Sequence, residues 1–116
     1  MSAAKCDIGA GGDEWPPRFQ FASDVWPGLA KLSEEAGEVV QVIGKIIGTG
    51  GTMRFRDGST IARSRLLEEL ADLQAALYFV VKYNLTSAER QARDDRYVAK
   101  VALFERWRRE EGEPRG

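Results

Sequence analysis

The chain has 116 residues, 43% of them hydrophobic, and its 17 basic and 18 acidic side chains give a net charge of −1. These values fit one soluble globular domain and exclude an overall positive field that would recruit nucleic acid. The chain has no histidine and one cysteine, Cys6, which excludes His-based zinc sites, Ser-His triads and an intramolecular disulfide. Any bound metal must therefore sit on oxygen ligands, which Mg²⁺ and Mn²⁺ prefer.

The sequence shows no signal for a membrane or for secretion. No apolar run approaches the roughly 18 residues needed to cross a bilayer, and the first residues lack the basic and apolar regions of a signal peptide. We therefore expect a cytoplasmic protein without a membrane partner. The short basic run at Arg106, Arg108 and Arg109 is interleaved with glutamates, so we expect no nucleic-acid partner either.

Residues 1–14 are rich in glycine and alanine and show no apolar periodicity, which predicts a flexible N-terminal arm. The prolines that follow suit the start of a helix, and a short N-terminal helix is predicted after them. Its apolar anchors would be Phe19, Phe21, Val25 and Trp26.

Apolar residues then recur at three- and four-residue steps over residues 27–47 and again over residues 60–83, as one face of a helix requires. The expected buried stripe of the first helix is Leu29, Leu32, Ala36, Val39, Val40, Ile43, Ile46 and Ile47, and that of the second is Ile61, Leu66, Leu67, Leu70, Leu73, Leu77, Val80 and Val81. Glycines end the first helix, Asn84 ends the second, and Asp57-Gly58 predicts a hairpin-like turn between them.

A third helix is predicted to start near Thr86 or Ser87, with Glu89 close enough to complete its cap, and to continue through Trp107. The third helix completes the set of elements that the sequence predicts.

The predicted fold is all-α: a helical bundle of two long antiparallel helices, a third C-terminal helix and the short N-terminal helix. One domain would span residues 15–111, followed by a frayed tail at residues 112–116. So few helices leave apolar surface uncovered, so we expect a homo-oligomer, either a dimer or a tetramer, to complete the bundle.

The two long helices each carry two carboxylates three residues apart, Glu35 with Glu38 and Glu69 with Asp72. Residues at this spacing are neighbours on a helix surface, about 5–6 Å apart at Cβ. When two such helices pack antiparallel, the pairs can face each other and offer four carboxylates to one or two cations. Both pairs border the apolar stripes, where carboxylates without basic partners need a cation. The pattern therefore predicts a metal site on these four residues.

A solvated helix face with salt bridges at i,i+4 is the alternative reading of any single acidic pair. Gly37 lies inside the first acidic segment, where it costs the helix roughly 1 kcal/mol relative to alanine. Close approach of another helix or of a ligand and plain helix packing explain that glycine equally well.

The segments Leu29-Ala-Lys-Leu-Ser-Glu-Glu-Ala-Gly-Glu and Leu66-Leu-Glu-Glu-Leu-Ala-Asp-Leu resemble the signature of MazG-like nucleotide pyrophosphohydrolases, an all-α NTP pyrophosphatase superfamily. The resemblance covers residues 26–107 and is closest to the small bacterial and bacteriophage type. It implies a hydrolase of nucleotide metabolism that acts on nucleoside triphosphates, often deoxy or non-standard ones. The implied reaction cleaves between the α and β phosphates to give a monophosphate and pyrophosphate, in the cytoplasm of the cell or of the phage host.

Carried over residue by residue, the resemblance places Mg²⁺, or Mn²⁺ in its stead, on Glu35, Glu38, Glu69 and Asp72. Glu34 matches the leading acidic position, and either Glu34 or Glu38 would take the proton of the attacking water. These two are the predicted catalytic residues.

Substrate contacts are predicted from the remaining cations and aromatic residues. Lys31 lies one turn before the first acidic pair and Lys100 matches a family lysine, so these two rank first for the phosphates. The chain departs from the family at Phe104, which stands in place of an asparagine, and in the long interval between the two acidic segments. Trp26 and Phe55 are candidates to stack on the base, with core packing as the alternative for Trp26.

Two other functions stay open at this point. The same metal site would serve an alarmone or another pyrophosphate-linked nucleotide, which substrate profiling separates. A non-catalytic helical oligomer would carry its acids for solubility, and thermal stabilisation by metal distinguishes it from the enzyme.

Overall fold

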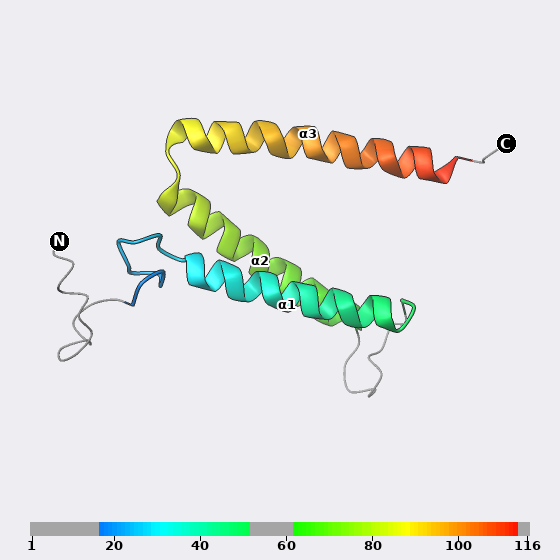
Figure 1. Ribbon diagram of the computed structural model, residues 1–116, viewed down its shortest axis with the longest axis horizontal. Helices are drawn as coiled ribbons and strands as arrows, with labels where there is room; N and C mark the ends of the chain where they lie inside the picture. The colour runs from blue at the N-terminus through cyan, green and yellow to red at the C-terminus, as the bar shows by residue number, and fades with distance from the viewer. Residues whose placement is uncertain (1–16, 52–61, 114–116) are drawn as a thin grey trace. The chain divides into compact units, whose positions relative to one another are not determined.

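The computed structural model describes residues 17–51 and 62–113, and this part of the chain forms three helices and no strand (Figure 1). Helix α1 spans Leu29–Gly48, α2 spans Ala62–Asn84 and α3 spans Ser87–Gly112. The all-α prediction is confirmed for the described residues. The predicted N-terminal arm, the Asp57-Gly58 turn and the last three residues of the predicted tail lie outside them.

The chain divides into two units, each with its own helices. The first unit ends at Asn84 and contains α1 and α2, and the second begins at Leu85 and contains α3. All four residues of the predicted metal site belong to the first unit, so α1 and α2 alone position them. The single domain predicted over residues 15–111 stays a prediction.

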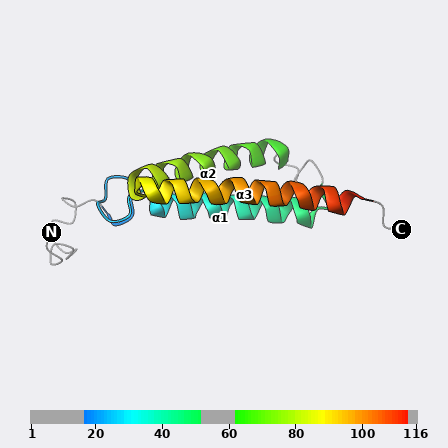
Figure 2. The same cartoon turned by 90° about the horizontal axis from the view of Figure 1, so that it is seen from above.

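Helices α1 and α2 run antiparallel and pack side by side, as both views of the ribbon show (Figures 1 and 2). Two buried positions of each helix correspond at an offset of 34 residues, whereas Val39 and Val80 have only half-buried equivalents. Glu35 and Val42 are buried in α1, and the equivalent Glu69 and Ala76 are buried in α2. Two antiparallel helices that bury equivalent positions are related by an approximate two-fold axis between them.

The predicted apolar stripes are correct only in part. Val39 is buried as predicted, but Val40 and Ile47 are 68% and 72% exposed, and Val42, which was not predicted, is 4% exposed. The stripe residues that lie exposed are Val40, Ile43, Ile47, Leu67 and Leu70. The predicted stripes have the width that a full bundle buries, whereas one pair of helices covers only the seam where the two touch.

The short N-terminal helix is a wrong prediction for the described residues 17–28, which form successive turns and bends. Phe19 and Trp26 have φ values of 68° and 48°, and a right-handed helix cannot continue through such residues. The backbone hydrogen bonds of this segment fold it onto the start of α1, where Phe19 O accepts from Ala30 N at 3.1 Å. Ser23, which is buried, closes one of the turns through its Oγ, which accepts from Val25 N at 2.9 Å.

The start of α1 is fixed to the end of α2. Gly28, with φ of 84°, packs so tightly that an added Cβ would lie 2.6 Å from Cδ1 of Phe79. Nearby, Nδ2 of Asn84 donates to the carbonyl oxygens of Pro27 and Val80, both at 2.9 Å. A glycine is required at position 28 for its conformation and for its size.

Helix α3 begins with the cap that the sequence predicts. The Thr86 hydroxyl accepts from Glu89 N at 3.1 Å, and the Glu89 carboxylate accepts from Thr86 N at 2.9 Å, which is a complete capping box. The helix continues to Gly112, slightly past the predicted fraying point, and none of its residues is buried. Among the described residues, no helix is long and apolar enough to span a membrane.

Candidate metal centre

The acidic residues of α1 and α2 belong to two copies of one eight-residue pattern. Residues 31–38 read Lys-Leu-Ser-Glu-Glu-Ala-Gly-Glu, and residues 65–72 read Arg-Leu-Leu-Glu-Glu-Leu-Ala-Asp. We call these two segments the paired acidic motif. Each copy places a cation at its first position, a buried glutamate at its fifth and a second acid at its eighth. The approximate two-fold axis therefore relates Glu35 to Glu69 and Glu38 to Asp72.

Three of the four predicted ligands come together at the seam between the helices. One carboxylate oxygen each from Glu35, Glu69 and Asp72 lies within 4.8 Å of the other two. Glu35 is 8% exposed and Glu69 only 4%, while Asp72 is exposed. The fourth, Glu38, is half-buried and close enough to raise the pKa of Glu69. The cluster thus combines two buried carboxylates with two that are at least partly exposed to solvent.

Each buried glutamate has one oxygen in an ion pair and one without a partner. Oε2 of Glu35 lies 3.4 Å from Nζ of Lys31, and Oε2 of Glu69 lies 2.8 Å from Nε of Arg65. Oε1 of both glutamates is buried and has no hydrogen-bond partner among the described residues. An unsatisfied buried charge is strongly unfavourable, and either protonation of the carboxyl group or a bound cation would remove this cost.

The surroundings of Glu69 disfavour its charge. Burial is the main cause that raises the pKa of Glu69 above its ordinary value, and the negative charge of Glu38 raises it further. Arg65 acts in the opposite direction without cancelling the rise. The site is therefore short of positive charge, which is the electrostatic condition that a divalent cation relieves.

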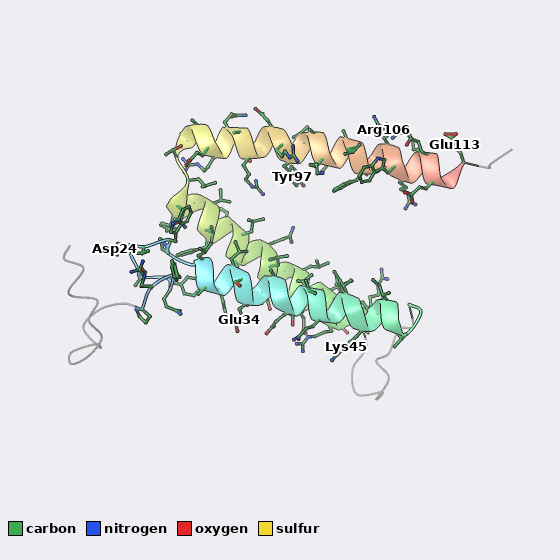
Figure 3. The ribbon with its side chains drawn as sticks, viewed as in Figure 1. Asp24, Glu34, Lys45, Tyr97, Arg106 and Glu113 are labelled. Carbon is green, nitrogen blue, oxygen red and sulfur yellow. The ribbon has the colours of Figure 1, made fainter. Side chains whose placement is uncertain are left out.

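Glu34 is separate from this cluster. Its side chain is exposed and lies 3.1 Å from Nζ of Lys31, and Figure 3 shows it projecting from α1. The Glu34 carboxylate, and with a smaller effect Glu35, raises the pKa of Lys31. Lys31 therefore contacts an exposed and a buried carboxylate at once.

The remaining predicted substrate residues are not brought to the cluster by any described contact. Trp26 is exposed in the turn segment before α1, which removes core packing as its role. Lys100 lies in the second unit, with its Nζ 5.3 Å from the ring centroid of Phe104. Phe55 lies outside the described residues. Their predicted roles toward a nucleotide stay predictions.

Gly37 stands beside open space. Among the described residues, no atom lies within 4 Å of the position that a Cβ would take there. Helix packing, one of the two explanations that the sequence allowed, therefore does not account for this glycine within the α1–α2 pair. Gly44 and Gly48 of the same helix also stand beside open space, so this space alone does not assign a role to Gly37.

Arg65, which lies 2.8 Å from Glu69, is not among the residues predicted from the sequence. The acids were expected to lack basic partners, whereas both buried glutamates have one. The signal was available, because Lys31 and Arg65 each precede a glutamate by four residues, the spacing of an ion pair on a helix.

Comparisons with known proteins do not assign a family to the chain. No protein-family model matches it, and neither a curated protein nor a solved structure matches it.

Proposed function

We propose that the protein is a metal-dependent nucleotide pyrophosphohydrolase of the MazG-like kind, which hydrolyses (deoxy)nucleoside triphosphates to monophosphate and pyrophosphate. The observation that carries the proposal is the cluster of Glu35, Glu69 and Asp72, in which two buried carboxylate oxygens have no partner among the described residues. The resemblance of the paired acidic motif to the MazG-like signature supports the choice of reaction.

The residues present fit a hard divalent cation. All the donors are carboxylate oxygens, which Mg²⁺ and Mn²⁺ prefer over softer ligands. Oxygens bound to Mg²⁺ at about 2.1 Å lie at most about 4.2 Å apart. The observed limit of 4.8 Å exceeds that span by less than the reach of a side-chain rotation. Glu35, Glu69 and Asp72 would hold the ion, with Glu38 as the fourth ligand.

When bound, the cation would offset the charge of the triphosphate and position a water for attack on the α-phosphorus. The chain's own residues would supply the rest. Glu38 is half-buried beside Glu69, whereas Glu34 is exposed and paired with Lys31, which favours Glu38 as the acceptor of the proton from the water. The space beside Gly37 would leave the phosphates room to approach α1.

The test is pyrophosphate release from a panel of nucleoside triphosphates with Mg²⁺, with Mn²⁺ and with chelator. Wild-type protein should release pyrophosphate only with metal. Asp72→Asn should lower kcat by a hundredfold or more, about the effect of removing a main electrostatic group. Glu68→Gln is the matched control, because it removes an exposed carboxylate from the same turn of α2 and should retain near-wild-type kcat.

Release of single phosphate instead of pyrophosphate would contradict the proposed bond. An Asp72→Asn variant with wild-type kcat would contradict the proposed ligand set. If the protein hydrolysed an alarmone but no nucleoside triphosphate, the same site would be assigned to the alternative class of substrate.

A non-catalytic interaction protein is the second candidate, and the exposed apolar side chains of α1 and α2 favour it. Thermal melting with and without Mg²⁺ separates the two. A cation that binds only the folded state raises the melting temperature as its concentration rises, whereas an interaction protein without a metal site shows no such rise.

A further inference from the structure

Lys31 and Arg65 occupy the same position in the two copies of the paired acidic motif. Each precedes its buried glutamate by four residues, and each pairs with the Oε2 atom of that glutamate. The approximate two-fold axis thus relates two ion pairs as well as the acids. The same arrangement on both helices indicates that the ion pairs are part of the site.

The cations reach the buried carboxylates from the solvent side. The side chains of Lys31 and Arg65 are 40% and 44% exposed, while those of their partners Glu35 and Glu69 are 11% and 5% exposed. Long basic side chains on a helix surface can change direction at small cost, because their stems stay packed while their charged ends move. The carboxylates lie in the seam, whereas the charged ends of both cations lie within reach of solvent, where Lys31 also pairs with Glu34.

We propose that Lys31 and Arg65 are exchangeable counter-ions, which pair with Glu35 and Glu69 in the metal-free protein and turn to the phosphate oxygens of the substrate when a divalent cation binds. This inference rests on the proposed function, because it requires the metal site. It assigns a joint substrate-binding role to Arg65 and Lys31, with the polyphosphate chain as the ligand.

Charge balance explains why the exchange occurs. At full ionisation the four carboxylates and Glu34, which also pairs with Lys31, carry five negative charges, of which the two basic residues offset two. The metal-free site is therefore negative and repels a polyphosphate. A divalent cation would supply two of the three missing charges and bind the buried carboxylates directly, which would weaken their hold on the basic side chains. Arg65 and Lys31 then have charge to offer to an anion.

This exchange makes metal and polyphosphate bind with positive coupling. Metal binding frees the two cations for the phosphates, and by linkage the polyphosphate raises the affinity for metal by the same factor. Substitution of either basic residue should therefore change the two affinities in opposite directions. A purely structural ion pair would lower both affinities or neither.

The experiment measures Mn²⁺ binding alone, by calorimetry, and then the binding of inorganic tripolyphosphate at saturating Mn²⁺. Lys31→Gln and Arg65→Gln should each bind Mn²⁺ about threefold tighter, since each removes a competing ion pair. Both should bind tripolyphosphate about tenfold more weakly. Arg65→Lys, which keeps the charge, should bind both Mn²⁺ and tripolyphosphate about as tightly as wild type. If Arg65→Gln does not fold, Lys31→Gln tests the inference and Arg65→Lys shows that position 65 tolerates substitution.

Arg63→Gln is the matched control, because it removes the same charge from the same turn of α2 without removing the ion pair to Glu69. Equal effects of Arg63→Gln and Arg65→Gln would reduce the result to general electrostatics and overturn the inference. Unchanged or weaker Mn²⁺ binding by the Lys31 and Arg65 variants would also overturn it, with the proposed metal site left standing. Failure of wild-type protein to bind Mn²⁺ would instead defeat the proposed function itself.

Discussion

The charge of Glu69 is held almost out of contact with solvent, and only one of its two oxygens has a partner among the described residues. A protein without use for that charge would be more stable with an uncharged residue, because desolvation of a carboxylate costs several kcal/mol. Burial raises the pKa of Glu69, so the charged form of this carboxyl group is less favourable in the folded metal-free protein than in the unfolded chain. An uncharged residue at this position would favour the stability of the metal-free protein, whereas a carboxylate would favour metal binding.

Glu69→Gln should raise the melting temperature of the metal-free protein at neutral pH and abolish the further rise caused by Mg²⁺ or Mn²⁺. Glutamine keeps the shape of the side chain and removes the buried charge, while the exposed end of Arg65 returns to solvent. Thermal melting with chelator and with metal measures both effects. A melting temperature of Glu69→Gln below that of wild type in chelator would mean that the ion pair with Arg65 outweighs the cost of burying the Glu69 charge.

The pH dependence of the metal-free protein follows from the same shift. Because the folded-state pKa of Glu69 is raised above its ordinary value of 4.5, its contribution to stability is fully present below that value and is lost as pH rises through the raised pKa. The difference in melting temperature between wild type and Glu69→Gln should therefore be smallest in acid and grow towards neutral pH. A constant difference across this range would show that the titration of Glu69 does not affect folding.

Gly28→Ala should destabilise the α1–α2 pair by about 2 kcal/mol or more, since it combines a positive φ with overpacking against Phe79. Gly44→Ala is the matched control: it lies within α1 with nothing within 4 Å among the described residues, and should stabilise by about 0.5–1 kcal/mol. Urea denaturation followed by circular dichroism measures both. Equal effects at the two positions would contradict the close packing of Gly28.

At the scale of the helices, the sequence predicted most of what the structure shows. The limits of α1, α2 and α3 follow from apolar periodicity, glycine stops and the Thr86 cap, all of which are local signals. The predicted N-terminal helix is wrong because Phe19 and Trp26 adopt positive φ. This conformation depends on hydrogen bonds to the start of α1 rather than on local sequence.

The four acidic residues of the candidate site could be predicted from their spacing on each helix. The ion pairs and the oxygen atoms without partners could not. A three-residue spacing on each helix was enough to pair Glu35 with Glu38 and Glu69 with Asp72. Which oxygens lack partners depends on how the two helices pack and where Arg65 turns, and neither is encoded in a spacing within one helix.

Thr86→Ala should destabilise the start of α3 by about 1 kcal/mol, because the first helical N–H groups lose their acceptor. Hydrogen exchange of the first turn of α3 is the direct measurement, and faster exchange of the Glu89 amide is the expected result. Ser87→Ala, which leaves both bonds of the capping box in place, should leave that amide unchanged. Equal exchange rates in the two variants would rule out a stabilising role for the box.

At the scale of the whole molecule, the exposed apolar side chains of α1 and α2 bear on whether the chain associates with copies of itself. Val40 and Ile47 lie on α1, Leu67 and Tyr78 lie on α2, and all four are more than 60% exposed. Exposed apolar side chains that form a continuous patch are typical of surfaces that another protein covers. We therefore retain a homo-oligomer as part of the proposal for this protein.

Sedimentation equilibrium should give a mass of at least two chains for the wild-type protein. Val40→Ser combined with Ile47→Ser should lower the association constant about tenfold or more, because each substitution removes roughly 1–2 kcal/mol of apolar burial from an interface. The same change on a monomer would leave the mass unaltered. A wild-type protein that sediments as one chain at all concentrations would contradict the expected oligomer.

The repetition of one motif on two antiparallel helices means that the site is built from two similar halves. Each helix carries half of the carboxylates and one of the two basic residues, so neither half needs a partner of a different kind. Two identical helices of this kind, paired antiparallel, would therefore bring four acids and two cations together in the same way.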